Sequence, residues 1–225
     1  STTTNTLTTT TDYIARRGRS SISFQYRHNA GQETRIDPSV SNIVDIYMLE
    51  RTYDNLFRIW LQDGGTKPGA STSDQLRISY SGKLNPLKSL SDQIVYHPVK
   101  YKILFGSNAD EELQATFKVV KNTKTNVTDA VIRTRVIAAI NEFFALDNWD
   151  FGDAFYFTEL AAYVHNQLAP DLLTAVIVPN QSGQTFGSLF QINSAADEIF
   201  ISGATVDDVS IITALGANQL ASSGT

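Results

Sequence analysis

The chain of 225 residues has a formal net charge of −5 and contains no cysteine. General nucleic-acid-binding proteins usually have a basic balance, so this charge argues against that class. The lack of cysteine excludes disulfide scaffolds, thiolate zinc sites and cysteine nucleophiles, and no apolar run approaches the roughly 18 residues that a membrane span requires.

The N-terminal segment, residues 1–19, is rich in threonine and shows no core-forming periodicity. We therefore expect it to be flexible or to be ordered by a partner. The first residue is Ser1 rather than methionine, which suggests a fragment or a processed chain. The only basic cluster is Arg16, Arg17 and Arg19, which we interpret as a solvated face.

Residues 20–106 predict a first lobe in which strands flank two helices. Residues 20–28 alternate apolar and polar side chains, which is typical of a half-buried strand. Further along we expect strands at 42–48, 93–96 and 99–105, and helices at 53–62 and 73–87. The polar and acidic stretch 106–112 is the expected connector to the next lobe.

Residues 107–225 predict a second lobe, which contains the clearest helix of the chain. Residues 115–121 (ATFKVVK) alternate like a strand, and a helix pattern covers 128–146. Thr128 is suited to cap that helix. Its apolar residues recur at spacings of 4, 4 and 3 and form one stripe: Ile132, Val136, Ile140 and Phe143.

A second helix is expected at 158–169, capped by Thr158 and ended by Pro170, and is followed by an apolar strand at 175–178. Both helices need a sheet to cover, and its expected floor is Phe117, Val119, Val176 and Val178. The fold class is therefore α+β, with two linked strand–helix–helix–strand lobes whose helices pack on one face of small mixed sheets. The shared order suggests a weak internal repeat, offset by roughly 75 residues.

The second lobe contains a series of short motifs whose order and spacing are informative: 135–144 (RVIAAINEFF), 148–152 (NWDFG), 157–160 (FTEL), 176–179 (VIVP), 186–192 (FGSLFQI) and 197–202 (DEIFIS). Together they resemble the C-terminal region of the ring-forming baseplate wedge subunits, of the baseplate-J type, of T4-like contractile-tailed bacteriophages. The resemblance covers roughly residues 35–215 and depends on order and spacing, because no single motif is diagnostic.

The resemblance implies a structural protein of the virion tail baseplate that is assembled in the host cytoplasm. Its expected partners are other copies of itself, as a homodimer or in ring contacts, and other baseplate wedge proteins. It implies no enzyme activity and no nucleic-acid, membrane or small-molecule partner. Two alternatives remain open: a module of a related contractile injection device, or a small hydrolase, which would need a concave pocket with perturbed pKa values.

The sequence predicts no catalytic, metal or cofactor site. The histidines, His28, His97 and His165, are scattered, and none has another histidine three or four residues later. An EF-hand reading of residues 147–158 fails, because with Gly152 at the turn position Trp149 occupies a ligand position. The segment 183–187 (GQTFG) lacks the Lys-Ser/Thr of a phosphate loop.

The candidate interaction residues are aromatic or apolar and lie in or beside turns: Trp149, Phe151, Phe186, Leu189 and Phe190. We expect the acidic turn to expose its Trp149 and Phe151 while Phe155 and Phe157 point inward. Exposed aromatic residues are enriched at interface centres, which predicts self-association through this region. The alternative is that all five candidate residues complete the core.

Overall fold

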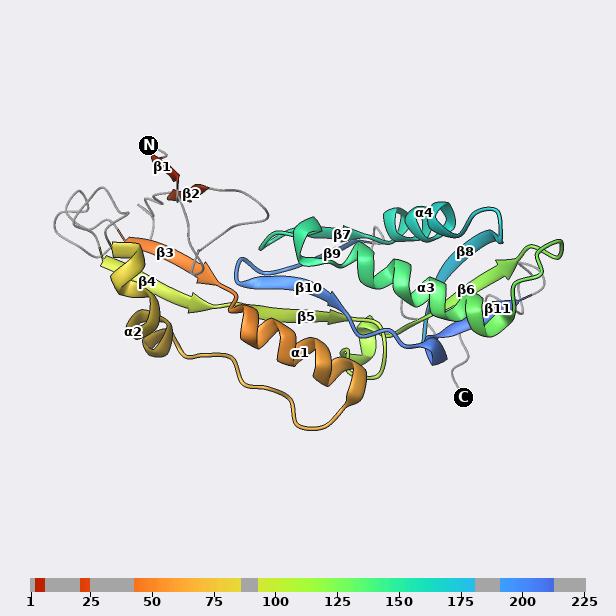
Figure 1. Cartoon of the computed structure of the whole chain (residues 1–225), viewed down its shortest axis with the longest axis horizontal. Coiled ribbons are helices and arrows are strands. Elements are labelled where there is room, and N and C mark those ends of the chain that lie inside the picture. Colours follow the sequence, from red (N-terminus) through yellow and green to blue (C-terminus); the bar gives the residue numbers. More distant parts are fainter. Residues whose placement is uncertain (1–2, 7–20, 25–42, 86–92, 181–190, 213–225) are drawn as a thin grey trace. The chain divides into compact units, whose positions relative to one another are not determined.

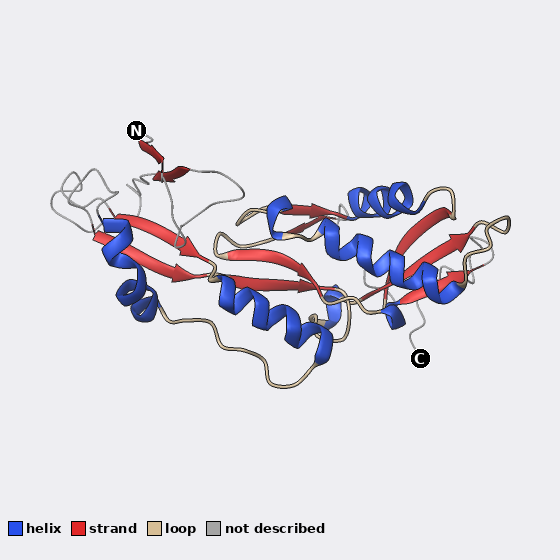
Figure 2. Ribbon diagram, viewed as in Figure 1, coloured by secondary structure: helices blue, strands red, loops and turns tan. Residues whose placement is uncertain are grey.

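The structure is a computed structural model that describes residues 3–6, 21–24, 43–85, 93–180 and 191–212 (Figure 1). The described residues form four α-helices and several small sheets of two or three strands, which confirms the α+β class (Figure 2). The chain divides into two compact units, Ser1–Phe57 with Lys67–Val99, and Arg58–Thr66 with Lys100–Thr225. The division passes through helix α1 (Arg51–Asp63).

The described residues of the first unit form, besides the start of α1, five regular elements: β1 (Thr3–Thr6), β2 (Ser21–Phe24), β3 (Ile43–Met48), α2 (Ser73–Leu84) and β4 (Gln93–Pro98). Strand β1 pairs antiparallel with β2, so part of the threonine-rich segment is a strand of this chain. Strands β3 and β4 pair in parallel, which requires a long crossover. The chain through α1 and α2 supplies it.

Helix α2 is fixed at its start and along its inner face. Thr72 accepts a hydrogen bond from the Gln75 backbone, and the Gln75 side chain accepts one from the Thr72 backbone, which is a capping box. Leu76 and Leu84 pack with Tyr96 of β4 in a small core. This core gives α2 and β4 a common apolar layer.

The second unit contains the end of α1 and the following elements: β5 (Lys100–Leu104), β6 (Ala115–Lys121), α3 (Asp129–Phe143), β7 (Ala154–Tyr156), α4 (Phe157–Leu168), β8 (Leu172–Pro179), β9 (Gln191–Asn193), β10 (Glu198–Ser202) and β11 (Val209–Ile212). The main sheet has the order β11-β6-β8, with β11 parallel and β8 antiparallel to β6. Strands β5 and β10 form a parallel pair, and β7 and β9 an antiparallel pair.

Helix α3 agrees with the sequence prediction in its start and in three of the four stripe residues, but Phe143 is half-buried and the helix ends there rather than at Leu146. The Thr128 hydroxyl accepts the Val131 N–H, and Ile132, Val136 and Ile140 are fully buried. The cap predicted for α4 is wrong. This helix begins at Phe157, its N-cap residue is Tyr156, and no side chain caps it, because β7 runs directly into the helix.

The two helices pack on the sheet as predicted, but the floor residues differ. Helix α3 packs on α4 and β11, and α4 packs on β8. Phe117 pairs with Ile177, and Lys118 with Val176. Because directly opposed residues share a face, Val176 and Val178 lie on the face opposite to Phe117. The floor beneath the helices is therefore Phe117 and Val119 with Ile177 and Ala175.

The arrangement of the strands bears on the expected internal repeat and on where the two units separate. Strands β3 and β4 are parallel, whereas β6 and β8 are antiparallel, so the two halves do not repeat one topology. The expected lobes were 20–106 and 107–225, but the compact units separate between Val99 and Lys100. The pairing of β5 with β10 is the reason, because it ties residues 100–104 to the C-terminal part of the chain.

The core of the second unit is a cluster of aromatic rings. Phe105 contacts Phe117 of β6 at a centroid distance of 4.9 Å, and it also contacts Phe144 and Phe157. Phe155, which is fully buried, extends the cluster. Edge-to-face contacts of this kind hold both helices and the sheet around one centre.

Candidate functional site

The aromatic turn between α3 and β7 does not expose Trp149, so this part of the interface prediction is wrong. Trp149 is 7% exposed. Its indole N–H donates to the Phe143 carbonyl over 2.8 Å, and its ring stacks on Phe144 at 5.5 Å and meets Phe200 edge-on. Trp149 is therefore a core residue of the second unit. Phe155 and Phe157 point inward as predicted.

Phe151 is half-buried, and the acids around it stabilise the turn. Asp153 accepts the Asp150 N–H over 2.7 Å, and Asp150 accepts the N–H of Phe151 over 3.0 Å. These carboxylates are engaged by the backbone rather than gathered around a common point. The remaining predicted interface residues, Phe186, Leu189 and Phe190, lie outside the described residues.

The described histidines lie in different elements. His97 of β4 lies 2.7 Å from the Asp45 carboxylate and stacks on Tyr47, at the surface of the first unit. His165 lies on α4, and its Nδ1 is buried without a hydrogen-bond partner among the described residues. No hydroxyl nucleophile contacts either ring in the described hydrogen bonds. His28 lies outside the described residues.

A further polar cluster, in the first unit, joins two segments of the chain rather than forming a binding site. The Glu50 carboxylate accepts hydrogen bonds from the hydroxyls of Ser71 and Tyr80. Burial, followed by the hydrogen bond and the negative charge of Glu50, raises the pKa of Tyr80. The cluster ties the segment before α1 to α2. Across the described residues, no group of three or more potential ligands could hold a metal ion.

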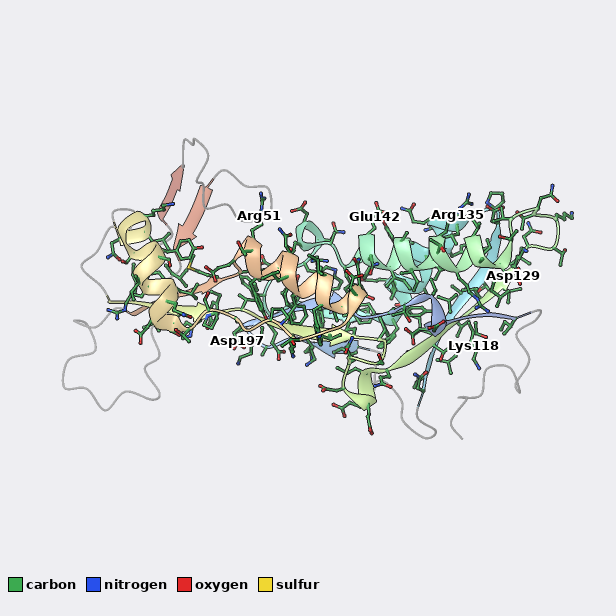
Figure 3. All side chains as sticks on the ribbon, turned by 60° about the horizontal axis from the view of Figure 1, so that its bottom comes forward. Arg51, Lys118, Asp129, Arg135, Glu142 and Asp197 are labelled. Carbon is green, nitrogen blue, oxygen red and sulfur yellow. The ribbon has the colours of Figure 1, made fainter. Side chains whose placement is uncertain are left out.

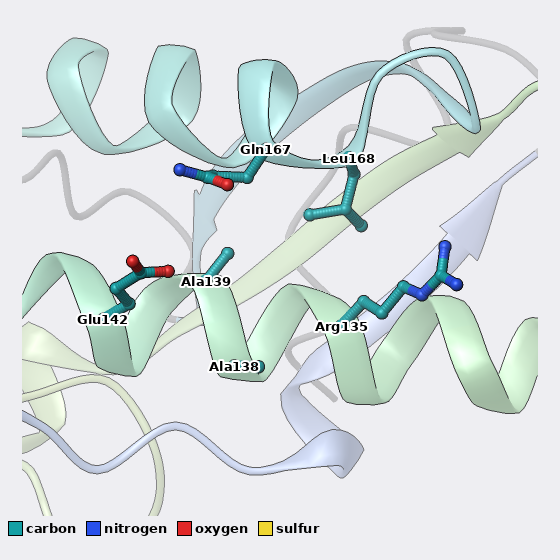
Figure 4. Close-up of a pocket in the computed structure, with 6 residues that line it drawn as sticks. All are labelled: Arg135, Ala138, Ala139, Glu142, Gln167 and Leu168. Atoms are coloured by element: carbon teal, nitrogen blue, oxygen red, sulfur yellow. The ribbon is translucent and has the colours of Figure 1, made fainter.

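The candidate site that the geometry favours is a shallow groove between α3 and α4, with a volume of about 260 Å³. Its lining, shown in Figure 4, comes from two helices: Arg135, Ala138, Ala139, Glu142, Gln167 and Leu168. Small side chains lie at its middle, and opposite charges lie towards its two ends. The groove presents one guanidinium, one carboxylate and one amide beside small and apolar side chains, so it can bind a partner through charge and hydrogen bonds.

Each charged end of the groove is held by a neighbour within the second unit. Arg135 donates to Asp171 over 3.0 Å, yet its side chain is still 54% exposed. At the other end, the Tyr163 hydroxyl donates to Glu142. Burial, together with the negative Glu142, raises the pKa of Tyr163. The Arg135 guanidinium and the Glu142 carboxylate are thereby positioned on the solvent side of α3.

Sequence reasoning did not identify this groove. Arg135, Ala138 and Glu142 recur at spacings of 3 and 4 on α3, and this spacing marks one helix face. That face could have been found as the complement of the apolar stripe. Gln167 and Leu168, however, reach the groove only through the packing of α4 on α3.

No protein-family model matches the chain, and the comparison with curated proteins gives no significant match. Among the described residues, no helix has the length and apolar character needed to cross a membrane.

Proposed function

We propose that the chain is a structural subunit of a contractile-tail baseplate wedge of a bacteriophage. In this role it associates with further copies of itself and with other wedge proteins to form the ring around the tail hub. The protein acts in the virion tail baseplate, after assembly in the host cytoplasm. Its task is to make and hold contacts, and no chemical step is assigned to it.

The observation that carries the proposal is where the resembling motifs lie in the fold. Residues 135–144 form most of α3, 148–152 the following turn, 157–160 the start of α4, and 176–179 the end of β8. These segments are consecutive and pack on one another. The resemblance therefore concerns one continuous piece of structure rather than scattered short matches.

Within these motifs several apolar residues are buried. Val136 and Trp149 are in the core, as are Phe157 and Leu160. Buried positions determine a fold, whereas exposed positions determine partners. The resemblance therefore supports a shared wedge-type framework, and the partner-specific surface is expected to be this chain's own.

The form of the candidate site supports a binding role over an enzymatic one. Enzyme pockets are usually concave, and they converge a few polar groups on one point. The groove between α3 and α4 is shallow, and its charged groups, Arg135 and Glu142, lie two helical turns apart. Such a surface suits a protein partner that covers it along its length.

Sedimentation velocity of the purified chain tests this proposal. The chain is run alone at increasing concentration and then with candidate wedge proteins, with an unrelated acidic protein of similar size as the control. We expect species heavier than the 24.8 kDa monomer, and a further increase with wedge proteins but not with the control. A chain that stays monomeric at high micromolar concentration and binds no wedge protein would contradict the proposal.

A further inference from the structure

One exposed face of α3 has a positive charge at one end and a negative charge at the other, a pattern that is complementary to itself about a two-fold axis. Arg135 lies three residues before Ala138, and Glu142 lies three residues after Ala139. The midpoint of the pattern therefore lies between the two alanines. Figure 3 shows Asp129, Arg135 and Glu142 in order along this helix. Asp129, which pairs with Lys121 over 2.9 Å, does not line the groove, so Arg135 and Glu142 are its two charged lining residues.

From this pattern we propose that a second copy of the chain occupies the groove. The two α3 helices would lie antiparallel, about a two-fold axis at Ala138 and Ala139. The inference rests on the self-association contained in the proposed function and names the surface that provides it. An interface about a two-fold axis uses the same patch on both copies, so the patch must be complementary to itself.

Charge complementarity selects the antiparallel orientation. With the axis at the alanines, Arg135 of each copy lies opposite Glu142 of the other, which gives two equivalent ion pairs. A parallel alignment in register would instead oppose Arg135 to Arg135 and Glu142 to Glu142. Ion pairs at the rim of an interface contribute little affinity, but they determine orientation and exclude wrong arrangements.

The middle of the groove permits the two helices to approach closely. The side chain of Ala138 is exposed and ends at its Cβ, so no long group separates the helix axes. Helices that cross at small residues can pack at the short end of the usual axial distance, about 8 Å. Val131, which is 41% exposed and one turn before Arg135, adds apolar area on the same helix.

A helix from another protein would match the groove equally well only if it placed a negative charge opposite Arg135 and a positive charge opposite Glu142. The chain itself supplies that order, which is why a second copy is the occupant that the groove favours. Other occupants become outcomes of the experiments below.

Charge reversal tests the proposed orientation. Arg135→Glu and Glu142→Arg are prepared separately, and both are checked for folding because Arg135 also pairs with Asp171. Each variant alone should dimerise at least about tenfold more weakly than the wild type. An equimolar mixture should recover the dimer, because the two reversed surfaces complement each other. Arg133→Glu, on α3 but outside the groove lining, is the control and should behave like the wild type.

A cysteine crosslink tests the position of the axis. The chain has no cysteine, so Ala138→Cys introduces a single thiol close to the proposed axis. Mild oxidation should convert this variant to a covalent dimer, since paired Cα atoms of about 4.4–6.8 Å can be bridged. Ala130→Cys is the control, because its two copies would lie about 26 Å apart along antiparallel helices.

The inference is overturned if the wild type is monomeric, if both reversal variants dimerise like the wild type, if their mixture recovers nothing, or if Ala138→Cys does not crosslink. Binding of wedge proteins by the same variants separates this failure from that of the proposed function. Variants that lose the dimer but still bind wedge proteins leave the proposed function intact. A folded wild type that neither dimerises nor binds wedge proteins would contradict both the dimer and the proposed function.

Discussion

Gly106 and Gly203 approach each other so closely that neither can carry a side chain. A Cβ added to Gly106 would lie 2.0 Å from the carbonyl oxygen of Gly203. A Cβ added to Gly203 would lie 2.8 Å from the carbonyl oxygen of Phe105. The Gly203 N–H donates to Leu104 over 2.8 Å, so this contact closes the end of the β5–β10 pair.

We therefore expect Gly106→Ala to be strongly destabilising. Gly106 has a φ of 70°, where a side chain costs about 1–2 kcal/mol, and the overlap adds to that cost. The free energy of unfolding, measured with a chemical denaturant, should fall by more than about 3 kcal/mol. Gly82→Ala is the matched control, because a Cβ there meets nothing within 4 Å and alanine favours a helix. Equal free energies of unfolding for the two variants would show that the backbones at Gly106 and Gly203 leave room for a side chain.

Trp149→Ala should unfold the second unit rather than dissociate an oligomer. The side chain is buried among Phe143, Phe144 and Phe200, and such truncations cost about 3–5 kcal/mol. Trp149→Phe should cost less, since it keeps a ring and loses chiefly the hydrogen bond to Phe143. Denaturant unfolding and sedimentation, run on the same samples, separate the two effects. Unchanged stability with weaker self-association would place Trp149 at an interface instead.

Tyr96→Phe should stabilise the first unit. Tyr96 is 3% exposed, and its hydroxyl has no hydrogen-bond partner among the described residues. Leaving such a group unsatisfied costs about 1–3 kcal/mol, which phenylalanine avoids. Thermal unfolding near neutral pH should show a higher Tm for the variant. The control is Tyr156→Phe, where the ring is 39% exposed and no change is expected.

The same substitution should change the alkaline limb of the stability profile. Burial raises the pKa of Tyr96 above its ordinary value of 10.0. Below that pH both states hold the proton, so this group adds no pH dependence. Above it the unfolded state ionises first, and stability falls as the pH rises. The advantage of Tyr96→Phe should therefore grow above pH 10.0, and an advantage that shrinks there would contradict this assignment.

Asp171→Ala should loosen the support of the groove. The Asp171 carboxylate accepts the Thr125 hydroxyl over 2.5 Å and the Arg135 guanidinium over 3.0 Å, and its backbone carbonyl accepts the Asn122 N–H. Losing hydrogen bonds to a charged acceptor costs about 1.5–3 kcal/mol in denaturant unfolding. Glu112→Ala, which removes an exposed carboxylate, is the control. If the free energy of unfolding of Asp171→Ala equals that of the control within error, the hydrogen bonds of Asp171 do not stabilise the groove.

Local sequence patterns predicted where helices and strands form better than they predicted which side chains those elements bury. The apolar stripe of α3 and the cap at Thr128 are visible in the sequence, because both depend on spacing within one helix. The place of Trp149 is not visible, since the acidic turn suggests exposure. Its burial depends on Phe143 and Phe144 before it and on Phe200 much later in the chain.

Features that depend on pairing or packing between elements were also hidden. A run of four apolar residues at 175–178 gives a strand but not which alternate residues face the helices, and only the pairing of Phe117 with Ile177 decides that. In the same way, Arg135 and Glu142 could be placed on one side of a helix from spacing alone. Their role as the ends of a groove depends on α4 packing beside α3.

Assembled particles offer the sharpest test of a structural role in a tail baseplate. Contractile tails produced from the genome that encodes this chain would be purified, their baseplates separated from sheath and tube, and each fraction analysed by quantitative mass spectrometry. We expect the chain to be enriched in the baseplate fraction, in a fixed ratio to the other wedge proteins. A chain found only in the soluble fraction of the lysed cells, and in no particle fraction, would contradict it.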